Sequence, residues 1–187
     1  MLDKILSLDE HLFILLNGLG SETFDGFWLV ITKQTSWIWL FLFLLYLIFK
    51  KFGTKQTLYL LLFVAVLVVI SDQTANAFKN GFQRLRPCSN PEINSFIRIV
   101  KSSATFSFFS GHAANSMAVA TFLYFILKKD FKYFWLLFLW PMIFAYSRIY
   151  LGLHYPLDII SGYFCGAIMG FLMFNLYQKA QKRYFPV

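Results

Sequence analysis

Three short stretches of the chain contain the residue types that chemistry on a phosphate group requires. They are residues 79–87, 110–112 and 147–158. Transfer of a phosphoryl group needs positive charge around its equatorial oxygens and a nucleophile in line with the leaving group. The cations Lys79, Arg86 and Arg148 come from two of these stretches, and a guanidinium group can bind two phosphate oxygens at once. We therefore expect these three side chains to form an anion clamp.

The third stretch also offers a nucleophile. His154 and Asp158 flank Pro156, a residue that suits the first position of a helix, so Asp158 should lie in the first helical turn. From there its carboxylate can reach back to one ring nitrogen of His154, fix the tautomer and leave the other nitrogen free to attack phosphorus. His112, in the second stretch, remains as the general acid that protonates the leaving alkoxide.

Ser110 and Gly111 complete the expected phosphate site. They come directly before an apolar run, where the free backbone N–H groups and the positive dipole end of a helix can bind an anion. Taken alone, Gly111 could be a helix-packing glycine, and a basic residue at the end of a span is usually a membrane anchor. The presence of all these residues at one membrane depth favours catalysis. We interpret Arg84 as an outer-face charge and His11 as a structural histidine.

Polar residues also occur inside one of the apolar segments. The spacing of Asp72, Asn76 and Lys79 places them on one face of a helix. A carboxylate within a membrane span is costly and usually faces a partner. Asp72 and Asn76 could therefore position Lys79 for phosphate binding, or they could make a polar contact to another span. The sequence leaves both alternatives open.

The composition indicates a membrane protein with one domain. Of the 187 residues, 58% are hydrophobic and only 14% are charged, whereas soluble domains carry about 25% charged residues. A net charge of +8 could suggest nucleic acid, but the bases divide between clusters beside apolar segments and isolated positions, without a nucleic-acid motif. We expect a single membrane-embedded domain over residues 1–187, no cleavable signal peptide, and free thiols at Cys88 and Cys165.

Long apolar segments predict the architecture. A helix needs about 20 residues to cross the hydrocarbon core, and the segments that approach this length are 57–78, 110–127, 131–150 and 156–177. The apolar segment 36–49 is shorter than a membrane span, and we expect it to extend back towards Phe24. Residues 3–17 alternate acids with apolar residues at helical spacing, which indicates an amphipathic helix in the membrane interface. The predicted fold is an all-α membrane bundle of about five transmembrane helices preceded by this helix, with six spans as the alternative.

Clusters of basic residues predict the orientation, because such clusters favour the cytoplasmic side. With five spans, all three clusters fall on one side of the membrane. They are Lys50, Lys51 and Lys55; Lys128, Lys129 and Lys132; and Lys179, Lys182 and Arg183. The N-terminus, the loop 80–109 and the turn around His154 then lie outside. We therefore expect a multi-pass protein of the bacterial inner membrane whose site faces the periplasm.

The three stretches closely resemble the signature of the type 2 phosphatidic acid phosphatase family, which includes vanadium haloperoxidases and glucose-6-phosphatases. That signature is Lys-x6-Arg-Pro, then Pro-Ser-Gly-His, then Ser-Arg-x5-His-x3-Asp. The first and third parts match from Lys79 to Pro87 and from Ser147 to Asp158. The second part departs only at Phe109, where the family usually has proline, and this change removes no chemical group. The resemblance extends over about residues 57–177, and many members have six spans, so the missing first span is a second departure.

The resemblance implies a role for each residue of the site. His154 would form a phosphohistidine, Asp158 would support it, and His112 would protonate the leaving group. The residues that would hold the phosphate are Lys79, Arg86, Ser110, Gly111 and Arg148. The stretches 86–88 and 112–116 also look like those of bacterial members of the Bacteroidetes type.

Other function classes fit these residues less well. A transporter or a non-catalytic scaffold, the main alternative, would place charged residues along a path through the membrane, whereas these gather at one end. A vanadate-dependent haloperoxidase would use a similar pocket, but such relatives are soluble. Because the sequence has no histidine and carboxylate cluster with ligand spacing, we expect no metal and no other cofactor. The candidate substrates are undecaprenyl diphosphate, phosphatidylglycerol phosphate, phosphatidic acid and a lipid A phosphate.

Overall fold

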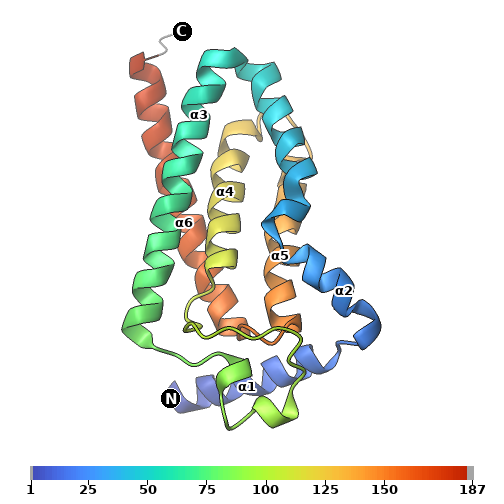
Figure 1. Cartoon of the computed structure of the whole chain (residues 1–187). Coiled ribbons are helices and arrows are strands. Elements are labelled where there is room, and N and C mark those ends of the chain that lie inside the picture. Colours follow the sequence, from blue (N-terminus) through green and yellow to red (C-terminus); the bar gives the residue numbers. More distant parts are fainter. Residues whose placement is uncertain (1, 185–187) are drawn as a thin grey trace.

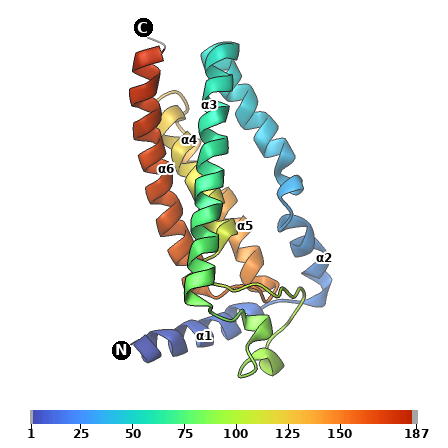
Figure 2. The same ribbon diagram turned by 60° about the vertical axis from the view of Figure 1, so that its left-hand side comes forward.

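The computed structural model describes residues 2–184, which form helices joined by loops, and these residues contain no strand. The α-helices are α1 (Leu2–Gly18), α2 (Glu22–Ile31), α3 (Ile38–Phe82), α4 (Gly111–Leu127), α5 (Leu139–Tyr150) and α6 (Pro156–Tyr184). Short 3-10 helices are η1 (Gln34–Trp37), η2 (Pro87–Ser89), η3 (Asn94–Phe96) and η4 (Phe134–Phe138). Helices α3 to α6 run roughly along one axis, and α1 lies across one end of this bundle (Figures 1 and 2).

Helix α3 is bent back on itself at Gly53. This residue has a φ of 67° and a ψ of −179°, a conformation that interrupts the helix and that glycine adopts readily. The limb before Gly53 therefore runs up the bundle and the limb after it runs down, as Figure 1 shows. The expected extension of residues 36–49 towards Phe24 takes the form of a separate helix, α2, because Lys33 is extended and η1 follows it.

The apolar helices fit a membrane protein. Two helical runs, Gln34–Ser89 and Pro156–Tyr184, are long and apolar enough to cross a membrane, and the former contains both limbs of α3. Two shorter apolar helical segments, Gly111–Leu127 and Phe134–Tyr150, lie between them in the chain. Five spans remain a prediction.

Three glycines of α6 bring this helix into backbone contact with α4. They are Gly162, Gly166 and Gly170, and we call them the glycine seam. A Cβ on Gly162 would lie 2.7 Å from the Ser110 carbonyl oxygen, and Cβ atoms on the other two would overlap the carbonyl oxygens of Ala114 and Ala118. Small residues at such intervals let helices approach closely within a membrane. The seam fixes the start of α4 against the start of α6.

The basic clusters all lie at the end of the bundle far from α1. The bend of α3, the end of α4 and the C-terminal part of α6 meet there, at the top of Figure 1. Lys51 pairs with Asp130, and its Nζ donates to the Ile126 carbonyl oxygen at 3.3 Å. The three clusters are thus on one side of the bundle.

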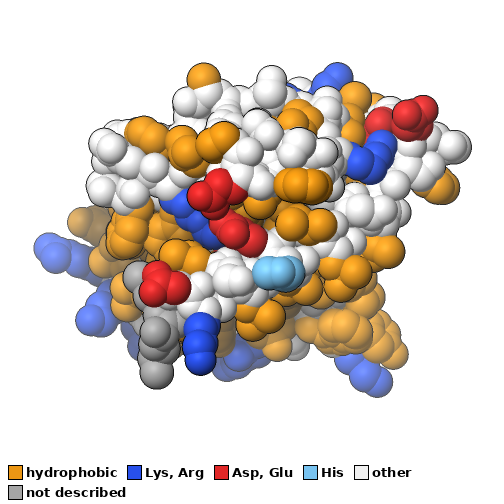
Figure 3. Space-filling view, turned by 90° about the horizontal axis from the view of Figure 1, so that it is seen from below, with side chains coloured by type: hydrophobic (Ala, Val, Ile, Leu, Met, Phe, Trp, Pro, Cys, Tyr) orange, Lys and Arg blue, Asp and Glu red, His pale blue; other side chains and the backbone are white. Residues whose placement is uncertain are grey.

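Helix α1 covers the opposite end with one face turned inward. Asp9, Phe13 and Asn17 are 6%, 0% and 0% exposed, whereas Leu8 and Leu15 on the other face are 69% and 63% exposed. The Asn17 amide donates to the carbonyl oxygens at the end of α5, so α1 is bonded to the bundle as well as packed on it. Figure 3 views this end from below, where apolar side chains and acids lie side by side. The placement of α1 in the membrane interface remains a prediction.

Candidate active site

His154 lies in the turn between α5 and α6 and is bonded to the first turn of α6. Its Nδ1 is 3.2 Å from Asp158 Oδ2, and the Tyr155 amide donates to the same oxygen at 3.0 Å. Gly152 has a φ of 84°, which turns the chain so that the His154 amide donates to the Arg148 carbonyl oxygen. His154 and Asp158 are 1% and 0% exposed, so both are held inside the protein.

Arg86 determines which nitrogen of His154 carries the proton. Its Nη1 lies 2.9 Å from His154 Nε2, and a guanidinium can only donate, so Nε2 must accept. In the neutral ring the proton is then on Nδ1, which donates it to Asp158. Arg86 is itself fixed by the carbonyl oxygens of Thr105 and Leu153 and by the Thr105 hydroxyl. The Nε2 lone pair is therefore directed at a cation, where an anionic phosphate would bind.

The surroundings of His154 favour its neutral form. Burial lowers its pKa well below the ordinary value of 6.5, and the positive charges of Arg86, Arg148 and Lys79 lower the pKa further. A neutral imidazole can act as a nucleophile, whereas a protonated one cannot. The three cations predicted from the sequence thus all lie close enough to act on the charge of this histidine.

The start of α4 is joined to the first turn of α6. The Ser110 amide donates to the Asp158 carbonyl oxygen at 3.0 Å, and the Ser110 hydroxyl caps α4 by accepting from the Ala113 amide at 3.4 Å. Gly111 begins the helix and is buried. The positive dipole end of α4 therefore lies beside the turn that carries His154, as an anion site requires.

Lys79 approaches this helix start from α3. A Cβ placed on Gly111 would lie 3.7 Å from Lys79 Nζ and 3.9 Å from Asp72 Oδ1. The Asn76 amide donates to Asp72 Oδ2 at 3.1 Å, so this pair forms one polar group on the face of α3 that also holds Lys79. The side-chain ends of Lys79 and Asp72 therefore lie at ordinary contact distance from the position that a Cβ of residue 111 would take.

Arg148 is buried at the end of α5, with only 7% of its surface exposed. Its Nη1 donates to the Thr32 hydroxyl at 2.7 Å, and among the described residues its Nε has no hydrogen-bond partner. A membrane anchor would extend its charge to water, whereas this guanidinium points inward and keeps donors available. Thr32 belongs to the segment between α2 and η1, and nothing in the sequence predicts its contact with Arg148.

His112 lies in the first turn of α4, and its ring packs against Phe144 with 4.9 Å between ring centroids. It interacts electrostatically with His154 and with the cations Arg148, Lys79 and Arg86. The two histidines and the three cations thus lie within electrostatic range of one another. Asp158 is bonded to both His154 and Ser110, and Lys79 lies near Gly111. Within residues 2–184 there is no group of three histidine, cysteine, aspartate or glutamate residues that could hold a metal ion.

The environment of Arg84 differs from the outer-face position expected from the sequence. It is not a solvated outer-face charge: its guanidinium donates to Asp158 at 2.8 Å and to Asp9 at 2.7 Å. Asp9 belongs to α1, 75 residues before Arg84 in the chain. No spacing rule links these residues, so the sequence pattern gives no signal for the contact.

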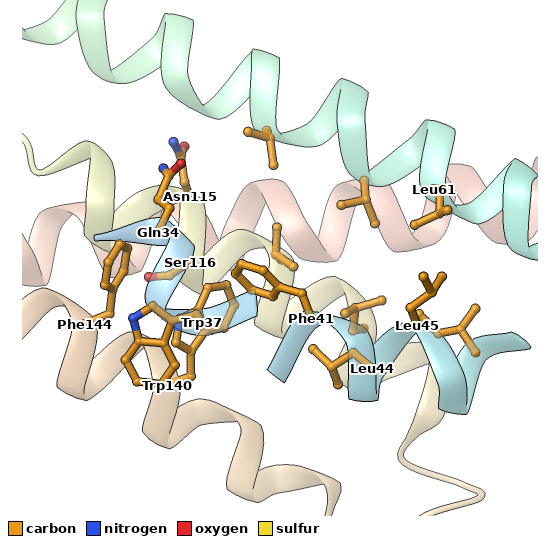
Figure 4. A pocket seen from close by; sticks show the side chains of 15 residues that line it. Gln34, Trp37, Phe41, Leu44, Leu45, Leu61, Asn115, Ser116, Trp140 and Phe144 are labelled. Carbon is orange, nitrogen blue, oxygen red and sulfur yellow. The ribbon is translucent and has the colours of Figure 1, made fainter. Parts of the chain in front are cut away.

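An apolar cavity of about 310 Å³ lies along the helix that carries His112. It is enclosed by the two limbs of α3 together with α4 and α5, and Figure 4 shows its aromatic and aliphatic lining. Asn115, Ser116 and Phe144 line the cavity near His112, and Gln34 projects towards Asn115 in the same view. The carbonyl oxygen of the Asn115 side chain is buried without a partner among the described residues.

Comparison with known proteins gives consistent matches. The family model described as PAP2 superfamily matches residues 56–182. A lipid A 4'-phosphatase of Porphyromonas gingivalis is 32% identical, over 98% of this chain and 78% of the relative, and one of Bacteroides thetaiotaomicron is 33% identical, over 98% and 83%. An undecaprenyl-diphosphatase of Sulfolobus acidocaldarius is 27% identical, over 91% and 79%.

Solved structures show the same fold. A PAP2 type phosphatidylglycerolphosphate phosphatase of Bacillus subtilis superposes with a TM-score of 0.72 at 19% identity, over 97% of this chain and 89% of that one. LpxE of Aquifex aeolicus superposes with a TM-score of 0.68 at 22% identity, over 90% and 95%.

Proposed function

The chain belongs to the PAP2 superfamily and is a phosphatase, and from this premise we propose that it hydrolyses a lipid phosphate through a phosphohistidine at His154. The observation that carries this proposal is the bonding of the His154 ring. Its Nδ1 is held by Asp158 and its Nε2 accepts from Arg86, so the nitrogen with the free lone pair faces the anion clamp. The transporter or scaffold alternative gives no reason for this arrangement.

The proposed reaction has two steps. His154 Nε2 attacks phosphorus as the bond to the lipid oxygen breaks, and His112 donates a proton to that oxygen. Arg86 Nη1 moves from Nε2 to a phosphate oxygen as the bond to phosphorus forms. Water then attacks phosphorus, His112 takes up its proton, and the bond between phosphorus and Nε2 breaks to release inorganic phosphate and free His154.

The phosphate oxygens are held by charge and by backbone donors. Lys79, Arg86 and Arg148 supply the positive charge. The Gly111 amide and the Ser110 hydroxyl supply donors at the helix start, since the Ser110 amide is bonded to the Asp158 carbonyl oxygen. Asp72 and Asn76 serve to position Lys79 from behind, which the approach of Lys79 Nζ and Asp72 to Gly111 supports.

We assign the substrate to lipids, and among them to a lipid A phosphate. The apolar cavity beside His112 can take part of an acyl chain while the phosphate lies at the clamp. The two lipid A 4'-phosphatase relatives match nearly the whole chain, which favours this lipid. Undecaprenyl diphosphate is the second candidate, because of the undecaprenyl-diphosphatase relative.

Phosphate release by the purified protein tests this assignment. We expect kcat/KM to be highest for lipid A, lower for undecaprenyl diphosphate, and lower again for phosphatidylglycerol phosphate and phosphatidic acid, all presented in the same detergent micelles. The matched blank is the His154→Ala variant. If no lipid releases phosphate faster than this blank, the proposed function is wrong; a different ranking would change only the substrate.

We expect turnover to persist in excess chelator. Lys79, Arg86 and Arg148 supply the positive charge that Mg²⁺ supplies in other phosphoryl-transfer enzymes. Orthovanadate should inhibit, because it adopts the shape of the transferring phosphoryl group. The measurement is the initial rate with and without EDTA. Collapse of the rate in EDTA, with recovery on addition of Mg²⁺, would show that the cations do not suffice.

We also propose that the site faces the periplasm of a bacterial inner membrane. The three basic clusters lie at the end of the bundle opposite the site, which the positive-inside rule assigns to the cytoplasm.

Accessibility of single cysteines tests this orientation. With Cys88→Ser and Cys165→Ala as background, Ser95→Cys near the site should react with an impermeant maleimide in intact spheroplasts. Lys129→Cys at the other end should react only after permeabilisation. Both positions are exposed, so burial does not confuse the comparison. The reverse labelling pattern would invert the proposed topology.

A further inference from the structure

Arg84 lies between two carboxylates that are distant in the chain. Its Nη1 donates to Asp158 Oδ1 at 2.8 Å, and its Nη2 donates to Asp9 Oδ2 at 2.7 Å. The guanidinium also stacks over the ring of Tyr155, with Cζ 3.9 Å from the ring centroid. Arg84 therefore contacts Asp158 through the oxygen that His154 does not use.

Asp9 is bonded to the nucleophile's helix by its other oxygen as well. Asp9 Oδ1 accepts from the Leu157 amide at 2.7 Å, and Asp9 is only 6% exposed. Leu157 is in the first turn of α6, where backbone amides have no partner within the helix. Asp9 thus caps α6 from α1 while it holds Arg84.

The charge of Arg84 stabilises the buried carboxylate of Asp158. Asp158 is fully buried, and a buried carboxylate is stable only when it is paired and hydrogen-bonded. Arg84 supplies that pairing. An arginine with a single carboxylate partner tends to bind both its oxygens as a fork, which would compete with His154 for Oδ2. Because Asp9 takes one arm of the guanidinium, Arg84 binds only Oδ1 and leaves Oδ2 to the histidine.

We propose that Asp9 and Arg84 are positioning residues that hold the Asp158 carboxylate in the orientation that keeps the proton of His154 on Nδ1. This inference rests on the proposed role of His154 as nucleophile. Among the described contacts neither residue bonds to His154 itself, so both act through Asp158. The family match begins at residue 56, so Asp9 lies outside it. Helix α1 is thereby part of the catalytic scaffold.

A double-mutant cycle with the full-length protein tests the coupling. Arg84→Gln should lower kcat for lipid phosphate release about tenfold to a hundredfold and leave KM within about twofold. In an Asp158→Asn background the same change should have almost no further effect, because the group that Arg84 positions is no longer a carboxylate. Asp9→Asn should lower kcat less, and only when Arg84 is present. Arg84→Lys, which keeps one charged bond, should recover part of the loss.

The position of the proton gives a readout that needs no substrate. In ¹⁵N spectra of histidine-labelled protein, His154 should be the Nδ1–H tautomer in the parent and a mixture of tautomers in Arg84→Gln and Asp9→Asn. The signals of His11 and His112 should not change. Asp3→Asn, an exposed acid of α1, and Arg183→Gln at the far end are the matched controls and should keep the parent kcat and spectrum.

Two results would overturn the inference. One is an equal loss of kcat from Arg84→Gln in both backgrounds, with an unchanged His154 tautomer, which would mean a general structural role. The other is a rise in KM at unchanged kcat, which would make Arg84 a direct phosphate ligand. If the parent protein released no phosphate, the proposed function would fail, while the tautomer measurement would still decide whether Asp9 and Arg84 position the pair.

Discussion

His154→Ala is expected to lower kcat for lipid phosphate by at least about ten-thousandfold, the scale of loss seen when one member of a nucleophilic catalytic unit is removed. The ring supplies the only protein atom that forms a bond to phosphorus in the proposed reaction. Because members of such a unit do not act independently, adding Asp158→Ala should make the enzyme little worse. The measurements are single-turnover phosphate release and trapping of the phosphoenzyme with labelled substrate.

The third histidine provides the matched control. His11 is exposed on α1, and its Nδ1 lies 2.6 Å from the Ser7 carbonyl oxygen, so His11→Ala should keep the parent rate. His154→Gln should be measured alongside, because a polar side chain can retain a bond to the buried Asp158 if alanine destabilises the fold. Near-normal turnover by either folded His154 variant would exclude the phosphohistidine mechanism.

Arg148→Lys is expected to fold and to lose about a hundred- to a thousandfold in kcat. This is the typical cost of removing one preorganised donor to a transition-state oxygen, and lysine lacks the planar fork that binds two oxygens. The structure sharpens the expectation, because Arg148 uses Nη1 for Thr32 and keeps its buried Nε without a partner among the described residues. Lysine places its donors on one nitrogen, so it cannot reproduce the separate positions of Nη1 and Nε.

Arg183→Lys at the other end of the bundle is the control, since Arg183 is exposed and should tolerate lysine. Thermal unfolding in detergent should be recorded for both variants, so that a loss of rate is separated from a loss of folded protein. If both lysine variants hydrolyse lipid phosphate at the parent rate, Arg148 is only an anchor and the clamp loses its central member.

Local patterns allowed much of the site to be predicted from the sequence. Pro156 begins α6 and Asp158 lies in its first turn, so the contact with His154 follows from helix geometry. The position of Ser110 as the cap of α4 follows from the same kind of rule. Apolar length likewise separated residues 36–49 from 57–78, and α3 is interrupted between them at Gly53. The break after α2, within the expected extension towards Phe24, was not predicted.

Contacts between distant segments could not be predicted. Asp9 and Arg84 are 75 residues apart in the chain, and Thr32 and Arg148 are 116 apart. Both contacts depend on how α1 and α2 fold back on the bundle. A hydrophobic pattern predicts that the apolar residues of a helix are buried. In α1, however, the polar residues Asp9 and Asn17 are also buried against the bundle. An amphipathic pattern identified α1 as a helix but did not show that the face with Asp9 and Asn17 packs on the bundle.

The glycine seam has a consequence for how the enzyme responds to its lipid environment. Because α4 and α6 touch through their backbones, this pair resists tilting when bilayer thickness changes, and it carries both His112 and Asp158. On the bent α3, Cβ atoms added to Gly53 and Gly81 would meet nothing within 4 Å, so these glycines form no comparable contact. The two limbs of α3 line the apolar cavity. Thinner or thicker membranes should therefore change the shape of the apolar cavity more than the spacing between His112 and Asp158.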